Sequence, residues 1–187
     1  MPTIAALVPM RHNSQRVPGK NYRPLAGKPL YQHIIETLLA VPEITSIMVD
    51  TDSEPVMDGL RAAFPRVKII QRPENLRAPE IPMNEILAYD TAQVEADFYL
   101  QTRLWDPLTR PINHNPAILL QTQDLPPVYE ENSCFYLFTR QNLLTRRNRM
   151  GERPLMFDIP RLEAIDIDEE ADFEIADLLM RRRLGIA

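Results

Sequence analysis

Short apolar runs alternate with helical patterns through the first half of the chain, and this alternation most constrains the fold. Runs without a polar residue at every second position are typical of strands buried on both faces of a parallel sheet. Such runs occur at residues 3–9, 44–51, 67–71 and 97–102. Segments with helical spacing lie between them, at residues 29–40, 54–64 and 83–96. The pattern predicts an α/β fold with a mostly parallel sheet flanked by helices.

This rhythm breaks after Thr102. Residues 103–116 contain three prolines and have no helical pattern, although a parallel crossover normally needs a dozen or more residues that include a helix. Beyond this break, we expect strands at residues 117–121, 133–138 and 161–168, and helices at residues 139–147 and 169–183.

Length and composition favour one domain over residues 1–187 that binds neither nucleic acid nor membrane. The net charge is −5, so the basic residues matter by their position and not by their number. No apolar stretch reaches the length of a membrane span, and the N-terminus does not follow the order of a secretion signal, so we expect a cytoplasmic protein.

The single cysteine, Cys134, is expected to be a buried strand residue, and no Cys/His cluster offers a zinc site.

A basic loop follows the first expected strand, in the sequence "VPMRHNSQRVPGKNYRPLAGKP". In parallel α/β sheets, ligands bind beyond the carboxyl ends of the strands, where this loop lies. Arg11, Arg16 and Lys20 supply the forked and compact positive charges that hold a polyphosphate, and Gly19 permits close approach of the backbone. Asn21 is able to take a left-handed turn. The spacing differs from that of a P-loop, and a merely solvated basic loop remains the alternative.

Asp166 and Asp168 form an acidic pair near the C-terminus, in a segment that looks like a strand. Residues two apart in a strand point to the same face, so these carboxylates could share one magnesium ion. An equally good explanation is a helix N-cap at Asp168 followed by an acidic first turn. Asp50 and Asp52 have the same spacing, but Asp52 or Ser53 is better explained as the cap of the next helix.

Several motifs together resemble those of the acylneuraminate cytidylyltransferase family, the CMP-sialic acid and CMP-Kdo synthetases. They are "LVPMRHNSQRVPGKN", "LAGKPL", "VDTDSE", "RPENL", "FYLQT" and "FDIPRLEAIDIDEEADFEIA". The resemblance implies a Rossmann-like nucleotidyltransferase fold and a homodimer. It also implies transfer of CMP from CTP to the anomeric hydroxyl of a sialic-acid-like 2-keto sugar acid, with Mg²⁺ and release of pyrophosphate.

The resemblance also implies roles for individual residues. It makes Arg11 and Lys20 the catalytic residues that hold the triphosphate, and it makes Gln101 and Thr102 the contacts to the sugar acid. Other nucleotide contacts are implied at Ser14, Arg16, Asn21 and Arg72. The metal ligands implied are Asp166 and Asp168. No general base stands out, because His12 and His33 are candidates by residue type only.

This sequence departs from the family pattern in two places. "HNSQ" replaces small residues and a lysine in the first motif, so Gln15 removes one phosphate contact. Family members also carry a few tens of residues, a helix and a strand, where this chain passes directly from Thr102 to Arg103. The fold could be rewired, a partner chain could fill the gap, or the full protein could contain residues absent from this sequence. Residues 103–130 are a candidate dimerisation arm.

Two other functions remain open at this point. One is a catalytically impaired relative that binds nucleotide without turnover, which the missing segment favours. The other is a nucleotidyltransferase that uses another nucleoside triphosphate and another acceptor.

Overall fold

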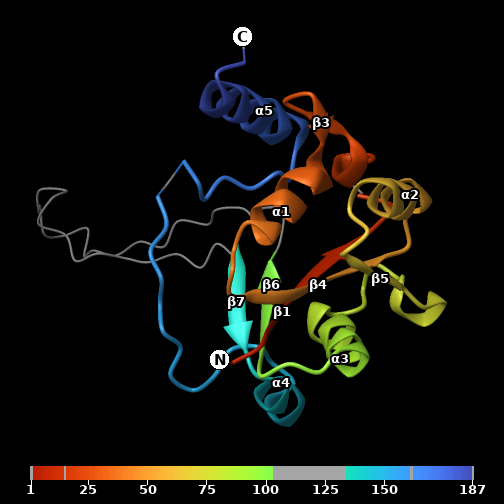
Figure 1. Cartoon of the computed structure of the whole chain (residues 1–187), viewed down its shortest axis with the longest axis vertical. Coiled ribbons are helices and arrows are strands. Elements are labelled where there is room, and N and C mark those ends of the chain that lie inside the picture. Colours follow the sequence, from red (N-terminus) through yellow and green to blue (C-terminus); the bar gives the residue numbers. More distant parts are fainter. Residues whose placement is uncertain (1, 15, 103–133, 161, 187) are drawn as a thin grey trace, which may run out of the picture.

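The computed structural model describes residues 2–14, 16–102, 134–160 and 162–186 (Figure 1). Its main sheet has the strand order β5-β4-β1-β6-β7. All pairs are parallel except β6 with β7, which is antiparallel. The strands are β1 (Ile4–Met10), β4 (Ile44–Thr51), β5 (Lys68–Gln71), β6 (Phe98–Thr102) and β7 (Phe135–Phe138).

Helices cover both faces of this sheet because its central strand is apolar on both sides. Ala6 and Val8 of β1 pack on one face against α1 (Leu30–Leu39) and α2 (Glu54–Ala63). Ala5 and Leu7 pack on the other face against α3 (Met83–Gln93) and α4 (Arg140–Arg146). The continuous apolar run of β1 therefore has the burial expected of a parallel sheet covered on both faces.

The chain changes direction across the sheet at β1. From β1 it passes through α1 to β4 on one side, and after β5 it returns through α3 to β6 on the other side. The carboxyl ends of β1 and β6 therefore lie next to each other at a topological switch point. Ligands of open α/β sheets bind at such points.

The last helix, α5 (Glu170–Leu184), packs beside the segment that follows β1 (Figure 1). Phe173 and Ala176 of α5 share a small core with Val17, Leu25 and Ile167. This core also contacts a short hairpin, and two single-turn 3-10 helices complete the fold. The bounds of these small elements are β2 (Pro24–Leu25), β3 (Lys28–Pro29), η1 (Lys20–Tyr22) and η2 (Glu74–Leu76). The C-terminal part of the chain is thereby joined to the basic loop.

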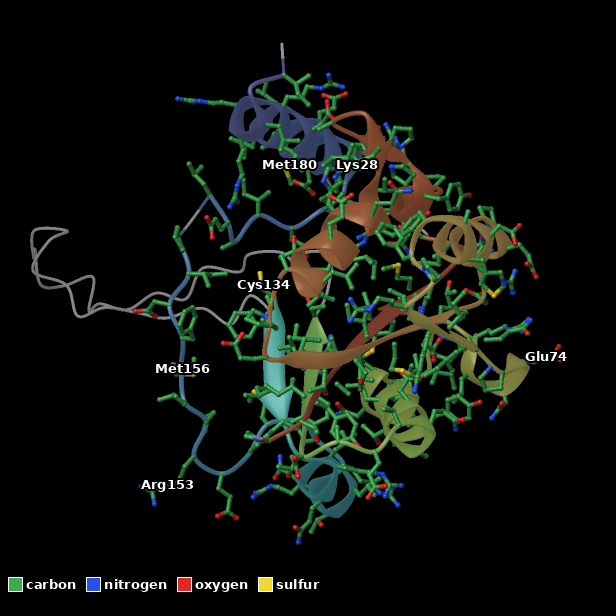
Figure 2. The ribbon with its side chains drawn as sticks, in the orientation of Figure 1. Lys28, Glu74, Cys134, Arg153, Met156 and Met180 are labelled. Carbon is green, nitrogen blue, oxygen red and sulfur yellow. The ribbon has the colours of Figure 1, made fainter. Side chains whose placement is uncertain are left out.

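The predicted α/β fold is confirmed, including the first four strands and the strand at β7. The strand predicted at residues 161–168 was wrong, because residues 162–168 form turns and irregular backbone. Cys134 was also misplaced, because it precedes β7 and is only half buried (Figure 2). The expected strand at 117–121 and the candidate arm at 103–130 lie outside the described residues. Within the described ranges, no helix combines the length and apolarity needed to cross a membrane.

Candidate functional site

A groove of about 530 Å³ opens at the carboxyl ends of β1 and β6. One wall is the end of β1 and the basic loop, and another is the segment 79–83 that leads into α3. Thr102 at the end of β6 and Asp168 before α5 complete it. This volume lies within the range of small-molecule binding sites. Of the predicted site residues, the groove is lined by Arg11, Ser14, Arg16, Lys20, Asn21, Thr102 and Asp168.

The basic loop is shaped by a left-handed residue, Gly19. Gly19 has φ of 68°, and a Cβ at this position would lie 2.9 Å from the ring of Tyr22. Tyr22 N donates to Gly19 O at 3.1 Å, which starts η1. The left-handed turn expected at Asn21 is thus made by Gly19. Asn21 is instead buried in η1 and donates through Nδ2 to the carbonyl of Arg11 at 2.8 Å.

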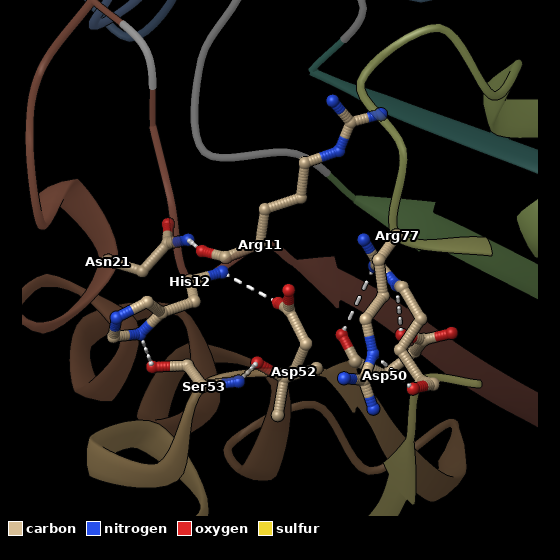
Figure 3. A network of polar contacts seen from close by, with 9 residues as sticks. Arg11, His12, Asn21, Asp50, Asp52, Ser53 and Arg77 are labelled. Carbon is tan, nitrogen blue, oxygen red and sulfur yellow. Dashed lines mark hydrogen bonds and ion pairs between the residues drawn. The ribbon is translucent and has the colours of Figure 1, made fainter. Parts of the chain in front are cut away.

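The loop is also tied to the segment between β4 and α2 (Figure 3). His12 N donates to Asp52 Oδ1 at 2.7 Å, and His12 Nδ1 lies 3.0 Å from Ser53 Oγ. Ser53 occupies the N-cap position of α2 as expected, but its hydroxyl contacts His12 and makes no hydrogen bond to the helix backbone. His12 is not among the described residues that line the groove. Its hydrogen bonds to Asp52 and Ser53 instead hold the basic loop against the segment between β4 and α2.

The acidic segment contacts the basic loop both through its backbone and through a side chain. Lys20 Nζ donates to the carbonyl of Ile167 at 2.6 Å, and Arg16 forms an ion pair with Asp168. Asp166 and Asp168 are 6% and 7% exposed, but only Asp168 lines the groove. The alternative that Asp168 is the helix N-cap was wrong by one residue, because Glu169 caps α5 in a capping box with Asp172. Asp168 is therefore available to the groove and is not used as the helix cap.

The acidic pair fits the needs of magnesium. Mg²⁺ is commonly held by one or two carboxylates together with water and substrate phosphates, so it does not require a larger protein cage. Asp168 Oδ2 accepts no hydrogen bond within the described part of the chain, whereas Oδ1 receives Arg16. The described residues contain no group of three or more His, Cys, Asp and Glu side chains that could hold a metal ion. A site here would thus depend on phosphate oxygens for most of its ligands.

Two residues predicted to contact substrate lie behind the groove. Arg72, expected near the nucleoside, is 1% exposed and donates through Nε to Asp50 Oδ1 at 2.6 Å. Gln101, expected at the sugar acid, is fully buried on the sheet face that packs against α3 and α4. Both polar atoms of its side chain lack a hydrogen-bond partner among the described residues. Neither residue belongs to the described lining of the groove.

One functional candidate was missed from the sequence, namely Asp90 on α3. Its side chain is 1% exposed and belongs to a buried cluster with Asp50 and Arg72. Burial raises the pKa of Asp90 to about 9; a hydrogen bond to Asp50 and the charge of Asp50 add to the rise, while Arg72 opposes it. The sequence did contain a signal for this residue. Asp90 lies one helical turn beyond Ile86 and Leu87, so it falls on the apolar, buried face of the helix, where an unpaired carboxylate is unusual.

A second hollow, of about 640 Å³, lies between α1 and α5 and is more apolar. Leu30, Ile34 and Met180 are among its lining residues, and Met180 is labelled in Figure 2. The groove at the strand ends is the better candidate site, because it combines the topological switch point with convergent charged side chains.

Comparison with known proteins gives two informative relatives. A 3-deoxy-manno-octulosonate cytidylyltransferase from Geobacter metallireducens is 30% identical over 115 residues, which cover 62% of this chain and 43% of the relative. The match thus spans less than half of that relative. A CMP-N,N'-diacetyllegionaminic acid synthase from Legionella pneumophila is 25% identical over 223 positions, covering 95% of this chain and 96% of the relative. This alignment is longer than the 187 residues of the chain, so the relative contains residues that this chain lacks.

A solved structure and a family model complete the comparison. The crystal structure of 4-diphosphocytidyl-2C-methyl-D-erythritol synthase matches with a TM-score of 0.63 and 14% identity, covering 96% of this chain and all of that one. At this identity the likeness shows the fold alone, and it confirms the expected Rossmann-like architecture. The family model described as "Cytidylyltransferase" matches residues 5–111, which is more than half of the chain. The chain therefore belongs to the cytidylyltransferase family.

Proposed function

We propose that this protein transfers CMP from CTP to the anomeric hydroxyl of a sialic-acid-like 2-keto sugar acid and releases pyrophosphate. The main support is the groove at the switch point. It brings Arg11, Arg16 and Lys20 together with Thr102 and Asp168 from distant parts of the sequence. Positive charge for a triphosphate, a carboxylate for its cation and the end of a central strand thus converge in one place.

The proposed reaction is an in-line displacement at the α-phosphorus of CTP. The oxygen of the sugar hydroxyl forms a bond to that phosphorus and loses its proton to water. The bond to the bridging oxygen of the β-phosphate breaks, and pyrophosphate leaves with its electron pair. Negative charge grows on the leaving oxygens during this step. Arg11 and Lys20 line the groove and would stabilise that charge, because fixed donors in a partly desolvated site interact strongly with developing anions.

The acidic pair, Asp166 and Asp168, would supply the magnesium ligands of this site, with Asp168 as the member that lines the groove and Asp166 two residues away, outside the described lining. When bound, magnesium would neutralise phosphate oxygens and hold the triphosphate in a defined conformation. Asp168 also forms an ion pair with Arg16, so the same carboxylate connects the acidic segment to the basic loop. Asn21 would lie against the nucleoside, since it is fixed at the wall of the groove by its hydrogen bond to the carbonyl of Arg11.

The identity of the acceptor is tested with a panel of sugar acids. Purified protein is incubated with CTP, Mg²⁺ and either N,N'-diacetyllegionaminic acid, 3-deoxy-manno-octulosonate or a sialic acid, and pyrophosphate release is measured. We expect release with CTP and one of these acids. The same assay with ATP, GTP and UTP identifies a different nucleotide specificity, and activity with another nucleotide but not with CTP would overturn the proposal.

A second candidate is a relative that binds nucleotide but does not turn it over. The alignment with the Legionella enzyme favours it, because residues present in that relative are lacking here. CTP binding measured by calorimetry without pyrophosphate release on any acid of the panel would support this function. Pyrophosphate release would exclude it.

We also propose that the protein is a homodimer. β7 ends the described part of the sheet, and Leu137 on this strand is exposed. Leu155, Met156 and Phe157 follow α4 in a segment without regular secondary structure and are exposed as well; Met156 is labelled in Figure 2. Exposed apolar residues at a sheet edge are typical of protein interfaces. Light scattering on the purified protein measures the mass in solution, and a monomer at micromolar concentration would contradict the dimer.

A further inference from the structure

A buried cluster of three charged residues lies outside the described lining of the groove. Asp50 stands near the end of β4, Arg72 follows β5, and Asp90 lies on α3. Each of the three side chains is 1% exposed. Asp50 and Met48 share the sheet face that packs against α3, because residues two apart in a strand point to the same side. Asp90 falls on the buried face of α3, so the two carboxylates meet.

The cluster contains one more carboxylate than it can neutralise. Arg72 Nε donates to Asp50 Oδ1 at 2.6 Å, and an Arg72 terminal nitrogen lies 3.4 Å from the carbonyl of Asp50. The other oxygen of Asp50 and both oxygens of Asp90 have no donor among the described residues. Two ionised carboxylates cannot hydrogen-bond to each other, whereas a proton on Asp90 allows its O–H to donate to Asp50.

The electrostatics agree with this arrangement. Burial raises the pKa of Asp90 to about 9, and the hydrogen bond to Asp50 and its charge act in the same direction. Arg72 lowers this pKa, but less strongly. These two residues are the charged groups that act on Asp90 within the described part of the chain. With Asp90 neutral, the cluster consists of one carboxylate paired with one guanidinium and has no net charge.

The cluster is connected to the groove through the backbone after Arg72. Arg72 N donates to Thr51 O at 3.0 Å, and Arg77 Nε donates to Arg72 O at 2.9 Å (Figure 3). Arg11, which lines the groove, donates to Pro79 O at 3.2 Å. Residues 79–83 form a wall of the groove, and Met83 begins the helix that carries Asp90. Arg72 therefore lies at the start of the stretch that leads into this wall, and Asp90 lies on the helix that follows it.

We propose that Asp90 is a positioning residue for this groove. As a neutral acid, Asp90 donates a hydrogen bond to Asp50, and Asp50 remains free to pair with Arg72. Together these contacts fix the segment 72–83. The inference deepens the proposed function, on which it rests for the identity of the bound nucleotide. Asp90 itself touches no substrate. Its contribution is to keep the wall of the groove in one conformation, which lowers the entropic cost of binding.

The test compares Asp90→Asn with Asp90→Leu in the full chain. Asparagine keeps the size and a hydrogen-bond donor and cannot ionise, whereas leucine is of similar size and has no donor. At about pH 7.5, we expect CTP affinity within about twofold of the wild type for Asp90→Asn and a loss of about tenfold for Asp90→Leu. Equal losses for both variants would overturn the proposal.

The pH profile separates positioning from a merely structural role. CTP affinity of the wild type should fall as the pH rises from about 7.5 through 9, because ionisation of Asp90 places a second negative charge beside Asp50. In Asp90→Asn, the part of the decrease in CTP affinity that is due to Asp90 should be absent. Other groups that titrate in this pH range affect both proteins equally, so their effect cancels when the two profiles are compared. Identical profiles for the two proteins would overturn the proposal, and this readout remains if Asp90→Leu does not fold.

Failure of the proposed function is recognised separately. If the wild type binds no CTP, amide hydrogen exchange of residues 72–83 without nucleotide tests the inference alone. Exchange in this segment should then rise between about pH 7.5 and 9 in the wild type more than in Asp90→Asn, after correction for the intrinsic pH dependence of exchange. The same rise in both proteins would overturn the inference, whatever the groove binds.

Discussion

Lys20 donates a hydrogen bond of 2.6 Å to the backbone carbonyl of Ile167, the residue between Asp166 and Asp168. The basic loop after the first strand and the acidic segment before the last helix are therefore parts of one site. The nearby ion pair of Arg16 with Asp168 strengthens this connection. Charges of both signs are held where a triphosphate and its cation are expected to bind.

Removal of the Lys20 charge should reduce catalysis more than binding. We expect Lys20→Ala to lower kcat for pyrophosphate release by about 100-fold, because the charge is most useful while the leaving group becomes negative. Lys28→Ala is the control, since Lys28 pairs with Glu36 on α1 and does not line the groove in the described structure. Steady-state kinetics measure both variants. A Lys20→Ala enzyme within about twofold of the wild type would contradict the role of Lys20.

Neutralisation of Asp168 should raise the magnesium requirement. We expect Asp168→Asn to increase the Mg²⁺ concentration for half-maximal activity by about tenfold, because one carboxylate ligand becomes a neutral amide. Glu170→Gln is the control, as it removes a nearby exposed carboxylate that pairs with Arg23. Circular dichroism monitors the fold of each variant. If Asp168→Asn unfolds or retains the wild-type magnesium dependence, the carboxylate is structural and not a metal ligand.

Loss of the buried guanidinium should destabilise the protein strongly. We expect Arg72→Leu to lower the free energy of unfolding by about 3–5 kcal/mol, because Asp50 is left buried without its partner. Arg61→Leu is the control, since it breaks an exposed pair with Asp58 that is worth about 0–1 kcal/mol. Urea titration measures both. Equal costs for the two variants would mean that the buried pair has no special weight.

The pH dependence of stability should reveal the proton on Asp90. Its pKa rises from 3.8 in the unfolded chain to about 9 in the folded protein, so the folded state binds this proton more tightly. The contribution to stability is therefore complete below about pH 4 and decreases as the pH rises toward 9, by up to about 1.4 kcal/mol per unit. Relative to Asp90→Asn, the wild type should lose stability over this range in urea titrations. A constant difference between the two proteins would show that Asp90 titrates normally.

Much of the fold could be predicted from local pattern. The apolar run of β1 and the helical spacing of α1 each identify an element without reference to the rest of the chain. The segment 162–168 was misread because its alternation of apolar and polar residues resembles a strand. Its backbone is instead fixed by tertiary contacts, including Lys20 with Ile167 O and Arg16 with Asp168. Such contacts between distant residues leave no periodic trace in the sequence.

The site was predictable to the extent that its residues belong to contiguous motifs. Arg11, Lys20 and Asn21 lie in one such motif, and all three line the groove. The position of Arg72 depends on the register of β4 with β5, in which Asp50 lies opposite Ile70 and near Arg72. Asp90 required the further knowledge that α3 packs on the face of the sheet that carries Asp50. These relationships are set by three-dimensional packing and were not accessible from single residues.

The most direct test of the proposed reaction is pyrophosphate release by the wild-type protein from CTP and Mg²⁺, with and without a 2-keto sugar acid, alongside mass spectrometry of the product. Release that depends on the sugar acid, together with the mass of a CMP-sugar acid conjugate, is the predicted result. Tight CTP binding with neither pyrophosphate nor conjugate, on every acid of the panel, would contradict CMP transfer and identify a nucleotide-binding protein without this activity.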